Sequence, residues 1–249
     1  MKRKTPAVIF ACGMCILAVG FLNMTVNGLT GSLGDTLNGS SDGSRKADEV
    51  VTIGEPATFT DGSTLVVTVP IHKDDPNLEV YGGSLRFEDR SSDYSRTWES
   101  IPTMTFNEST TFVTAALTGA SADPDLSIGF DEDDDEVYVT DIQEYDYLKE
   151  GASVEELREL YLSNWNDDVV ITIDSDDHGR VDYTVKTADG NPASMYGRVQ
   201  IRFMQGDTCI FSADEYYEGP HSQDTEVVKS YHCPYSLPDY TSVEIVPIS

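Results

Sequence analysis

The chain has 249 residues, with 16 basic against 44 acidic side chains and a formal net charge of −28 at pH 7. Five of the basic and two of the acidic residues precede residue 48, which leaves 11 against 42, or about −31, for the rest of the chain. Such a surface repels phosphate backbones and anionic lipid headgroups, so it disfavours nucleic acid and peripheral membrane binding. It suits cations or basic partners, and it also keeps an exposed protein soluble.

The N-terminus carries a targeting segment. Lys2, Arg3 and Lys4 precede an apolar run from Ala7 to Leu22, so this terminus stays in the cytoplasm and the remainder is exported. Small residues at 18–20 would permit cleavage, whereas about 16 apolar residues would also make a short anchor. We therefore expect 1–26 to be a signal peptide or membrane anchor of an extracytoplasmic protein, which contacts the membrane through this segment only.

Residues 27–47 are rich in Gly and Ser and show no apolar periodicity, so they predict a flexible stalk. Short alternating segments bounded by turn residues follow, which is the pattern of β-strands. The Asp61-Gly62 pair predicts a tight hairpin turn between the second and third of them. In residues 48–149 we expect strands at Val50–Ile53, Ala57–Thr60, Thr64–Ile71, Leu78–Phe87, Thr103–Phe106, Thr111–Leu117, Leu126–Phe130 and Val137–Ile142.

One helix is expected, within 150–166. Ser153 and Glu156 have the spacing of a capping box, and Leu157, Leu160 and Tyr161 follow at helical spacing. The sequence fits either a connector between domains or a helix packed across the end of a sandwich.

Strand patterns resume in 167–249. We expect strands at Val169–Ile173, Val181–Lys186, Arg198–Met204, Thr208–Ser212, Glu226–His232 and Ser242–Val246. This density of short strands suits an immunoglobulin-like sandwich. The predicted fold is therefore all-β, with two immunoglobulin-like β-sandwich domains at 48–149 and 167–249 and one short connecting helix, after the N-terminal signal or membrane segment.

The four cysteines form two different pairs. Cys12 and Cys15 lie inside the apolar segment, where they serve as small apolar residues. Cys209 and Cys233 lie in the exported part, each in or beside a predicted strand. Because exported thiols meet an oxidising environment, we expect a disulfide between Cys209 and Cys233.

Two stretches resemble a known family. The opening Val51–Glu55, followed by Phe59–Gly62, is similar to the first hairpin of immunoglobulin-like domains in secreted bacterial lipoproteins of unknown function. The strand and Gly turn of Ile201–Asp207, with the Tyr-led Asp239–Ile245, is similar to a related class. Together they cover about 100 of the 249 residues. The resemblance implies an extracytoplasmic sandwich, but the chain lacks the lipobox cysteine that carries the usual lipid anchor.

Common catalytic motifs are missing from the sequence. There is no G-x-S-x-G, no H-E-x-x-H and no Gly-rich phosphate loop, which speaks against a serine hydrolase, a zinc hydrolase and nucleotide chemistry. A carboxylate-based hydrolase stays open, because the many acidic residues offer pairs whose separation the sequence does not reveal. No catalytic residue is therefore assigned, and the protein is not expected to be an enzyme.

Calcium is the one cofactor for which the sequence offers candidate ligands; otherwise none is expected. Hard oxygen donors gather in two predicted loops, at 131–136 and 174–177, and extracellular Ca²⁺ binds such donors. Neither loop is an EF-hand, and solvated acidic loops are the competing interpretation. The candidate ligands are Asp131, Asp133, Asp135, Asp174 and Asp176.

Tyr216 and Tyr217 are candidate binding residues, because tyrosine serves binding surfaces well, although tyrosine is also ordinary in strands and core or edge packing is the favoured interpretation. The expected function is a cell-surface, extracytoplasmic binding or interaction module without catalytic activity, whose partner is an unknown protein or envelope component. The alternatives are a structural cell-envelope protein without a small ligand, and a carboxylate-based hydrolase.

Overall fold

The computed structural model describes residues 43–92, 95–106, 108–131, 133–165, 169–188, 196–218 and 225–248. Gly43–Ser249 forms one compact unit. The predicted segment 1–26 and most of the predicted stalk lie outside the described residues. Among the residues described, none of the helices has the length and apolar character needed to cross a membrane.

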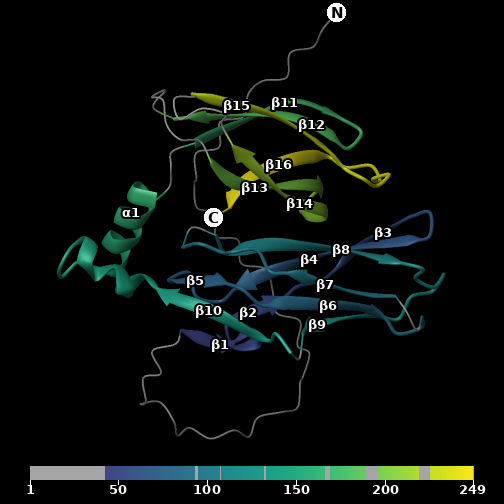
Figure 1. Cartoon of the computed structure of the whole chain (residues 1–249), viewed down its shortest axis with the longest axis horizontal. Coiled ribbons are helices and arrows are strands. Elements are labelled where there is room, and N and C mark those ends of the chain that lie inside the picture. Colours follow the sequence, from purple (N-terminus) through teal and green to yellow (C-terminus); the bar gives the residue numbers. More distant parts are fainter. Residues whose placement is uncertain are drawn as a thin grey trace, which may run out of the picture. The chain divides into compact units, whose positions relative to one another are not determined.

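Strands make up most of the described part of the chain, which confirms the all-β class (Figure 1). One α-helix, α1 (Val154–Trp165), and two short 3-10 helices, η1 (Ala47–Glu49) and η2 (Ile142–Leu148), accompany them. The strands are β1 (Ser44–Lys46), β2 (Val51–Ile53), β3 (Ala57–Asp61), β4 (Thr64–Lys73), β5 (Leu78–Tyr81), β6 (Ser84–Asp89), β7 (Arg96–Ser100), β8 (Thr110–Thr118), β9 (Leu126–Phe130), β10 (Glu136–Asp141), β11 (Val169–Asp177), β12 (Arg180–Thr187), β13 (Tyr196–Gln205), β14 (Thr208–Glu218), β15 (Glu226–His232) and β16 (Ser242–Ile248).

These strands pair antiparallel in five sheets. Three-stranded sheets have the orders β1-β10-β5, β7-β6-β9, β14-β13-β16 and β11-β12-β15, and in the remaining sheet β4 pairs with β2, β3 and β8. In Figure 1 the sheet of β4 and β8 lies between the other N-terminal sheets and the sheet of β13 and β14. The end of the predicted stalk belongs to this fold, because β1 pairs with β10 and Ala47 is buried.

Two large hydrophobic cores lie between the layers. In the first, Val67 and Ile71 of β4 pack with Leu85 and Phe87 of β6. In the second, residues of β12 and β15 pack against residues of β13 and β14, with Phe203 at 0 % exposure. Whether these cores correspond to the two domains expected from the sequence stays a prediction.

Strand β4 is buried on both faces and links the two cores. Val67 points into the first core and Val66 into the second, as alternation along a strand requires. On the Val66 face, Thr68 Oγ1 donates a hydrogen bond to the Ile210 carbonyl at 3.0 Å. The Ser212 N–H of the same edge strand, β14, donates to Thr114 Oγ1 at 2.9 Å. Threonine hydroxyls therefore satisfy the backbone groups that the edge of β14 would otherwise leave unpaired.

The predicted hairpin is confirmed: β3 and β4 pair with Asp61 opposite Thr64, and Gly62 has the φ of +60° that the turn requires. The predicted strand Leu78–Phe87 is instead two strands, because Gly82 and Gly83 both have positive φ and break it. The strand expected at Thr103–Phe106 is wrong, since this segment contributes only an isolated bridge from Met104 to Val80.

The predicted capping box is also confirmed. Glu156 N–H donates to Ser153 Oγ at 3.2 Å, and Ser153 N–H donates to Glu156 Oε2 at 2.9 Å, so α1 begins where the sequence indicates. The helix packs against η2 through Tyr161, whose ring lies edge-on to that of Tyr145 with centroids 4.8 Å apart. It therefore has a small apolar core of its own.

Candidate binding surface

Tyr216 and Tyr217 have opposite environments. Neighbouring strand residues point to opposite faces, so only one of the two reaches solvent. Tyr216 is 54 % exposed, whereas Tyr217 is 5 % exposed and packs in the second core against Gly197. Of the two predicted binding residues, the structure therefore leaves Tyr216 available to a partner and places Tyr217 in the core.

Tyr216 is part of a small surface that sequence reasoning missed. Arg198 is its register partner on β13, and the guanidinium carbon lies 5.2 Å from the Tyr216 ring centroid. Tyr196, which is 62 % exposed, lies on the same face two residues before Arg198, with its ring centroid 6.4 Å from that of Tyr216. We call Tyr196, Arg198 and Tyr216 the Tyr196–Tyr216 patch.

A chain of polar contacts fixes this patch to the interior. Arg198 Nη2 donates to Asp214 Oδ2 at 3.0 Å, and Gln200 Nε2 donates to Asp214 Oδ1 at 3.0 Å. Burial raises the pKa of the Asp214 carboxyl, while the hydrogen bond from Gln200 and the charge of Arg198 lower it. Asp214 thus fixes the position of the Arg198 guanidinium, which in turn contacts the Tyr216 ring.

This series of polar contacts continues along β13 toward the sheet of β4 and β8. Gln200 is fully buried, and its Oε1 accepts a hydrogen bond from Arg202 Nε at 2.9 Å. The Arg202 guanidinium carbon lies 5.0 Å from the Phe112 ring centroid. The Tyr196–Tyr216 patch therefore lies at the solvent-exposed end of one face of the β14-β13-β16 sheet. Strand β8 covers the other end of the same face.

Exposed aromatic side chains elsewhere are organised in the same way. Tyr81 and Tyr138 are 42 % and 48 % exposed and stack with centroids 5.4 Å apart and ring planes 16° apart. Trp98 is 45 % exposed, and the Arg96 guanidinium carbon lies 5.5 Å from its ring centroid. Within the described residues, every largely exposed aromatic ring therefore contacts another ring or an arginine.

No known protein family matches this chain, and a comparison with curated proteins finds no similar sequence.

The first group of calcium candidates lies at the turn between β9 and β10. Asp135 Oδ1 forms an ion pair with Lys46 Nζ at 2.6 Å, and the Asp133 N–H donates to Asp131 Oδ1 at 3.5 Å. A carboxylate that is occupied by a lysine offers less to a cation.

The second group lies along β11. Asp174 Oδ2 accepts from Thr184 Oγ1 at 2.6 Å, and Asp176 Oδ1 accepts from the Tyr240 hydroxyl at 2.5 Å. In the parts of the chain that the structure describes, no three His, Cys, Asp or Glu side chains are grouped to hold a metal ion. Calcium binding stays a prediction.

The structure does not support the disulfide between Cys209 and Cys233, because both are free and buried. Cys233 packs in the second core with Phe203. Cys209 pairs with Met204, the next residue after Phe203, and therefore lies on the opposite face of the sheet. The extra residue Ile210 forms a bulge that places Cys209 on this face. The sequence reveals neither the bulge nor the face on which Cys209 lies.

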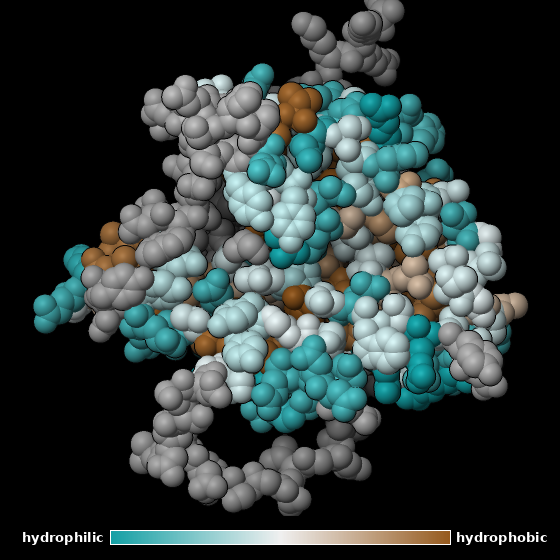
Figure 2. Space-filling model, viewed as in Figure 1, coloured by the Kyte–Doolittle hydropathy of each residue, from teal (hydrophilic) through white to brown (hydrophobic). Residues whose placement is uncertain are grey.

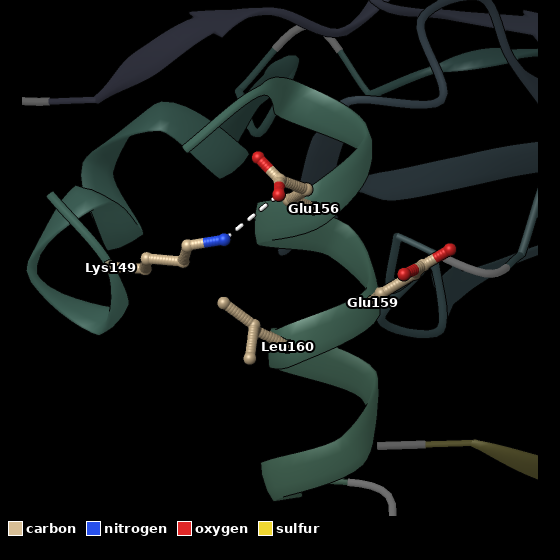
Figure 3. Close-up of a pocket in the computed structure, with 4 residues that line it drawn as sticks. All are labelled: Lys149, Glu156, Glu159 and Leu160. Carbon is tan, nitrogen blue, oxygen red and sulfur yellow. Dashed lines mark hydrogen bonds and ion pairs between the residues drawn. The ribbon is translucent and has the colours of Figure 1, made fainter. Parts of the chain in front are cut away.

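A shallow depression beside α1 is a poor candidate site. It has a volume of about 370 Å³ and is lined by Lys149, Glu156, Glu159 and Leu160. Figure 3 shows Lys149 reaching across it to Glu156, with an Nζ–Oε1 distance of 2.8 Å, while Glu159 points away from this pair. Its polar groups do not converge on a common point, as they do in ligand pockets.

Two titratable side chains lie beside the first core, Lys73 buried and Glu108 half-buried. Lys73 is 5 % exposed and donates through Nζ to the carbonyls of Leu78 and Thr105, both at 2.6 Å. Burial lowers the pKa of Lys73 to about 8 and raises that of Glu108 to about 7. Glu108 Oε2 accepts the Thr105 N–H at 3.2 Å, and Oε1 is buried without a hydrogen-bond partner. The pair makes the stability of this region depend on pH.

Proposed function

We propose that the protein is a non-catalytic binding module at the cell surface, which engages a protein or envelope partner through the Tyr196–Tyr216 patch. The observation that carries this proposal is that Tyr196 and Tyr216 are exposed beside the half-buried Arg198, which Asp214 holds in place with Gln200. Aromatic side chains supply large contact area at low entropic cost, and a preorganised surface loses less freedom on binding.

The partner is expected to present lysine or arginine. The net charge of −28 favours approach of a basic surface, and Glu218 lies opposite Tyr196 on the neighbouring strand. Tyrosine rings attract cations through their faces. Figure 2 shows mainly polar residues on the visible face with smaller apolar areas between them, which suits a reversible contact rather than a permanent one.

The finer fold assignment is part of the same proposal. Two separate cores support two immunoglobulin-like β-sandwiches, one built around β4 and β6 and one around β12 and β13. Such sandwiches commonly present binding surfaces outside the cell. The basic and apolar N-terminal segment supports export.

The test is saturable binding of the full-length protein to cell envelopes of the source organism. We expect Tyr196→Ala combined with Tyr216→Ala to weaken binding by about tenfold or more, because central aromatic residues dominate interface energies. The matched control is Tyr81→Ala combined with Tyr138→Ala, which removes another exposed pair of tyrosines, stacked on a different sheet. Equal binding by the wild type and the patch variant would favour the structural role instead.

A further inference from the structure

A second surface lies on the outer face of the sheet β7-β6-β9. Leu85 and Phe87 of β6 point into the first core, so Arg86 between them points outward. Arg86 is paired in register with Trp98 on β7 and with Gly129 on β9. A tryptophan, an arginine and a glycine therefore form one row across the open face of this sheet.

The tryptophan of this row is unusually accessible. Trp98 is 45 % exposed although large aromatic rings normally gain by burial. The Arg96 guanidinium stacks 5.5 Å from the centroid of its ring, which orients the indole. A broad apolar ring held in place on a sheet face is suited to pack against a flat partner.

The glycine of the row is not required by the fold. Glycine in a strand interior weakens the strand, and it commonly marks a turn, a bulge or a close approach by another group. Gly129 does not have a positive φ, and a Cβ atom built at this position would meet nothing within 4 Å. The missing side chain instead leaves bare backbone beside Arg86, where a ligand can lie close to the sheet.

The outer face of these strands carries more basic than acidic side chains, unlike the protein as a whole. Arg86 and Arg96 point outward from β6 and β7, and the acidic strand residue beside them is Glu88, the register partner of Arg96. Arg86 Nε lies 3.9 Å from Glu88 Oε2, which is a long distance for an ion pair. Guanidinium groups bind carboxylates through paired hydrogen bonds, so the surface complements a carboxylate-bearing ligand.

We propose that the face formed by Trp98, Arg86, Arg96 and Gly129 binds an acidic oligosaccharide. One sugar ring packs its C–H groups on the Trp98 indole, and another ring of the same oligosaccharide occupies the space over Gly129. Its carboxylate binds the guanidinium groups of Arg86 and Arg96. This site goes beyond the Tyr196–Tyr216 patch, because it uses a different sheet and a different ligand.

The test measures calorimetric binding of the full-length protein to four acidic glycans: oligogalacturonate, alginate oligomers, hyaluronan oligomers and polysialic acid. We expect at least one to bind, and its carboxyl-reduced form to bind about tenfold more weakly or worse. Trp98→Ala and Gly129→Ile should each weaken binding by about tenfold or more. Gly129→Ile should retain or raise the unfolding midpoint, since its Cβ has room and isoleucine favours strands.

The control is Tyr196→Ala combined with Tyr216→Ala, which should bind the glycan as the wild type does and so separates this site from the patch. Absence of binding to all four glycans would overturn the proposal. So would unchanged affinity in both Trp98→Ala and Gly129→Ile, or equal binding of the carboxyl-reduced ligand. Tighter, Trp98-dependent binding of poly-glutamate than of any glycan would assign the face to an acidic peptide and overturn it as well.

Discussion

The side-chain amide of Gln200 pairs with the backbone of Phe112 as a neighbouring strand would. Gln200 Nε2 donates to the Phe112 carbonyl at 2.9 Å, and Gln200 Oε1 accepts the Phe112 N–H at 3.2 Å. Phe112 lies on β8, which pairs with β4 on its other side. The side chain of Gln200, which belongs to the β14-β13-β16 sheet, thus satisfies two backbone groups at the edge of β8 in the sheet of β4.

Gln200→Ala should therefore lower the free energy of unfolding by about 2–4 kcal/mol, because it leaves two backbone groups and Arg202 Nε buried without partners. Urea unfolding measures this change. Gln205→Ala, an exposed glutamine on the same strand, is the control and should cost about 0.5 kcal/mol or less. A cost for Gln200→Ala as small as that of the control would show that the edge is satisfied in another way.

The raised pKa of Glu108 makes a prediction for pH dependence. The carboxyl has a reference pKa of 4.5 and a pKa of about 7 in the folded protein. Between these values the folded protein binds more protons than the unfolded chain, so the free energy of unfolding falls as the pH rises from 4.5 to 7. The charged groups facing it are Lys73, Arg202 and Asp214.

Glu108→Gln should remove this decline and make the protein more stable at pH 7.5, by on the order of 2 kcal/mol. Urea unfolding at a series of pH values between 4.5 and 8 compares the two proteins. Glu155→Gln replaces an exposed carboxyl on α1 and should leave the pH profile unchanged. If the difference between wild type and Glu108→Gln were constant over this range, the carboxyl would not titrate there.

Cysteine labelling distinguishes free thiols from the bridge expected from the sequence. Burial raises the pKa of Cys209 to about 12 and also raises that of Cys233. Because the thiolate is the reactive form, both should react slowly with iodoacetamide in the native protein and rapidly in urea without reductant. Peptide mass spectrometry locates the label. Absence of label at both positions in urea, restored by a reductant, would demonstrate a disulfide.

Two glycines should respond in opposite ways to the same substitution. A Cβ atom at Gly197 would overlap the Tyr217 ring and hydroxyl, so Gly197→Ala should destabilise the protein by about 1–3 kcal/mol. Gly129→Ala meets nothing and should stabilise it by about 0.5–1 kcal/mol. Thermal unfolding ranks the two variants against the wild type. The reverse order would mean that the packing around Tyr217 differs from that described.

Two local signals in the sequence predicted local features correctly. The Asp61–Gly62 turn and the Ser153–Glu156 capping box depend on neighbouring residues, and both form where expected. The strand at Thr64–Ile71 was predicted, but the sequence does not tell which layers cover Val66 and Val67. That depends on contacts between distant segments.

The candidate surfaces were only partly predictable for the same reason. Alternation ensures that one of Tyr216 and Tyr217 faces outward, but only the pairing of β13 with β14 decides which. The strand Arg96–Ser100, which carries Trp98, was missed because Glu and Ser dilute its apolar alternation. The alternation of Tyr196 and Arg198 with buried Val199 was a usable signal for the Tyr196–Tyr216 patch.

Hydroxyl-radical footprinting on intact cell envelopes tests the proposed binding surface most directly. The rate of side-chain oxidation at Tyr196 and Tyr216 is compared between free and envelope-bound full-length protein, with Tyr81 and Tyr138 as internal references. We expect both patch tyrosines to be protected and both reference tyrosines to oxidise at their free rates. Equal oxidation of Tyr196 and Tyr216 in the free and bound protein would contradict binding through this patch.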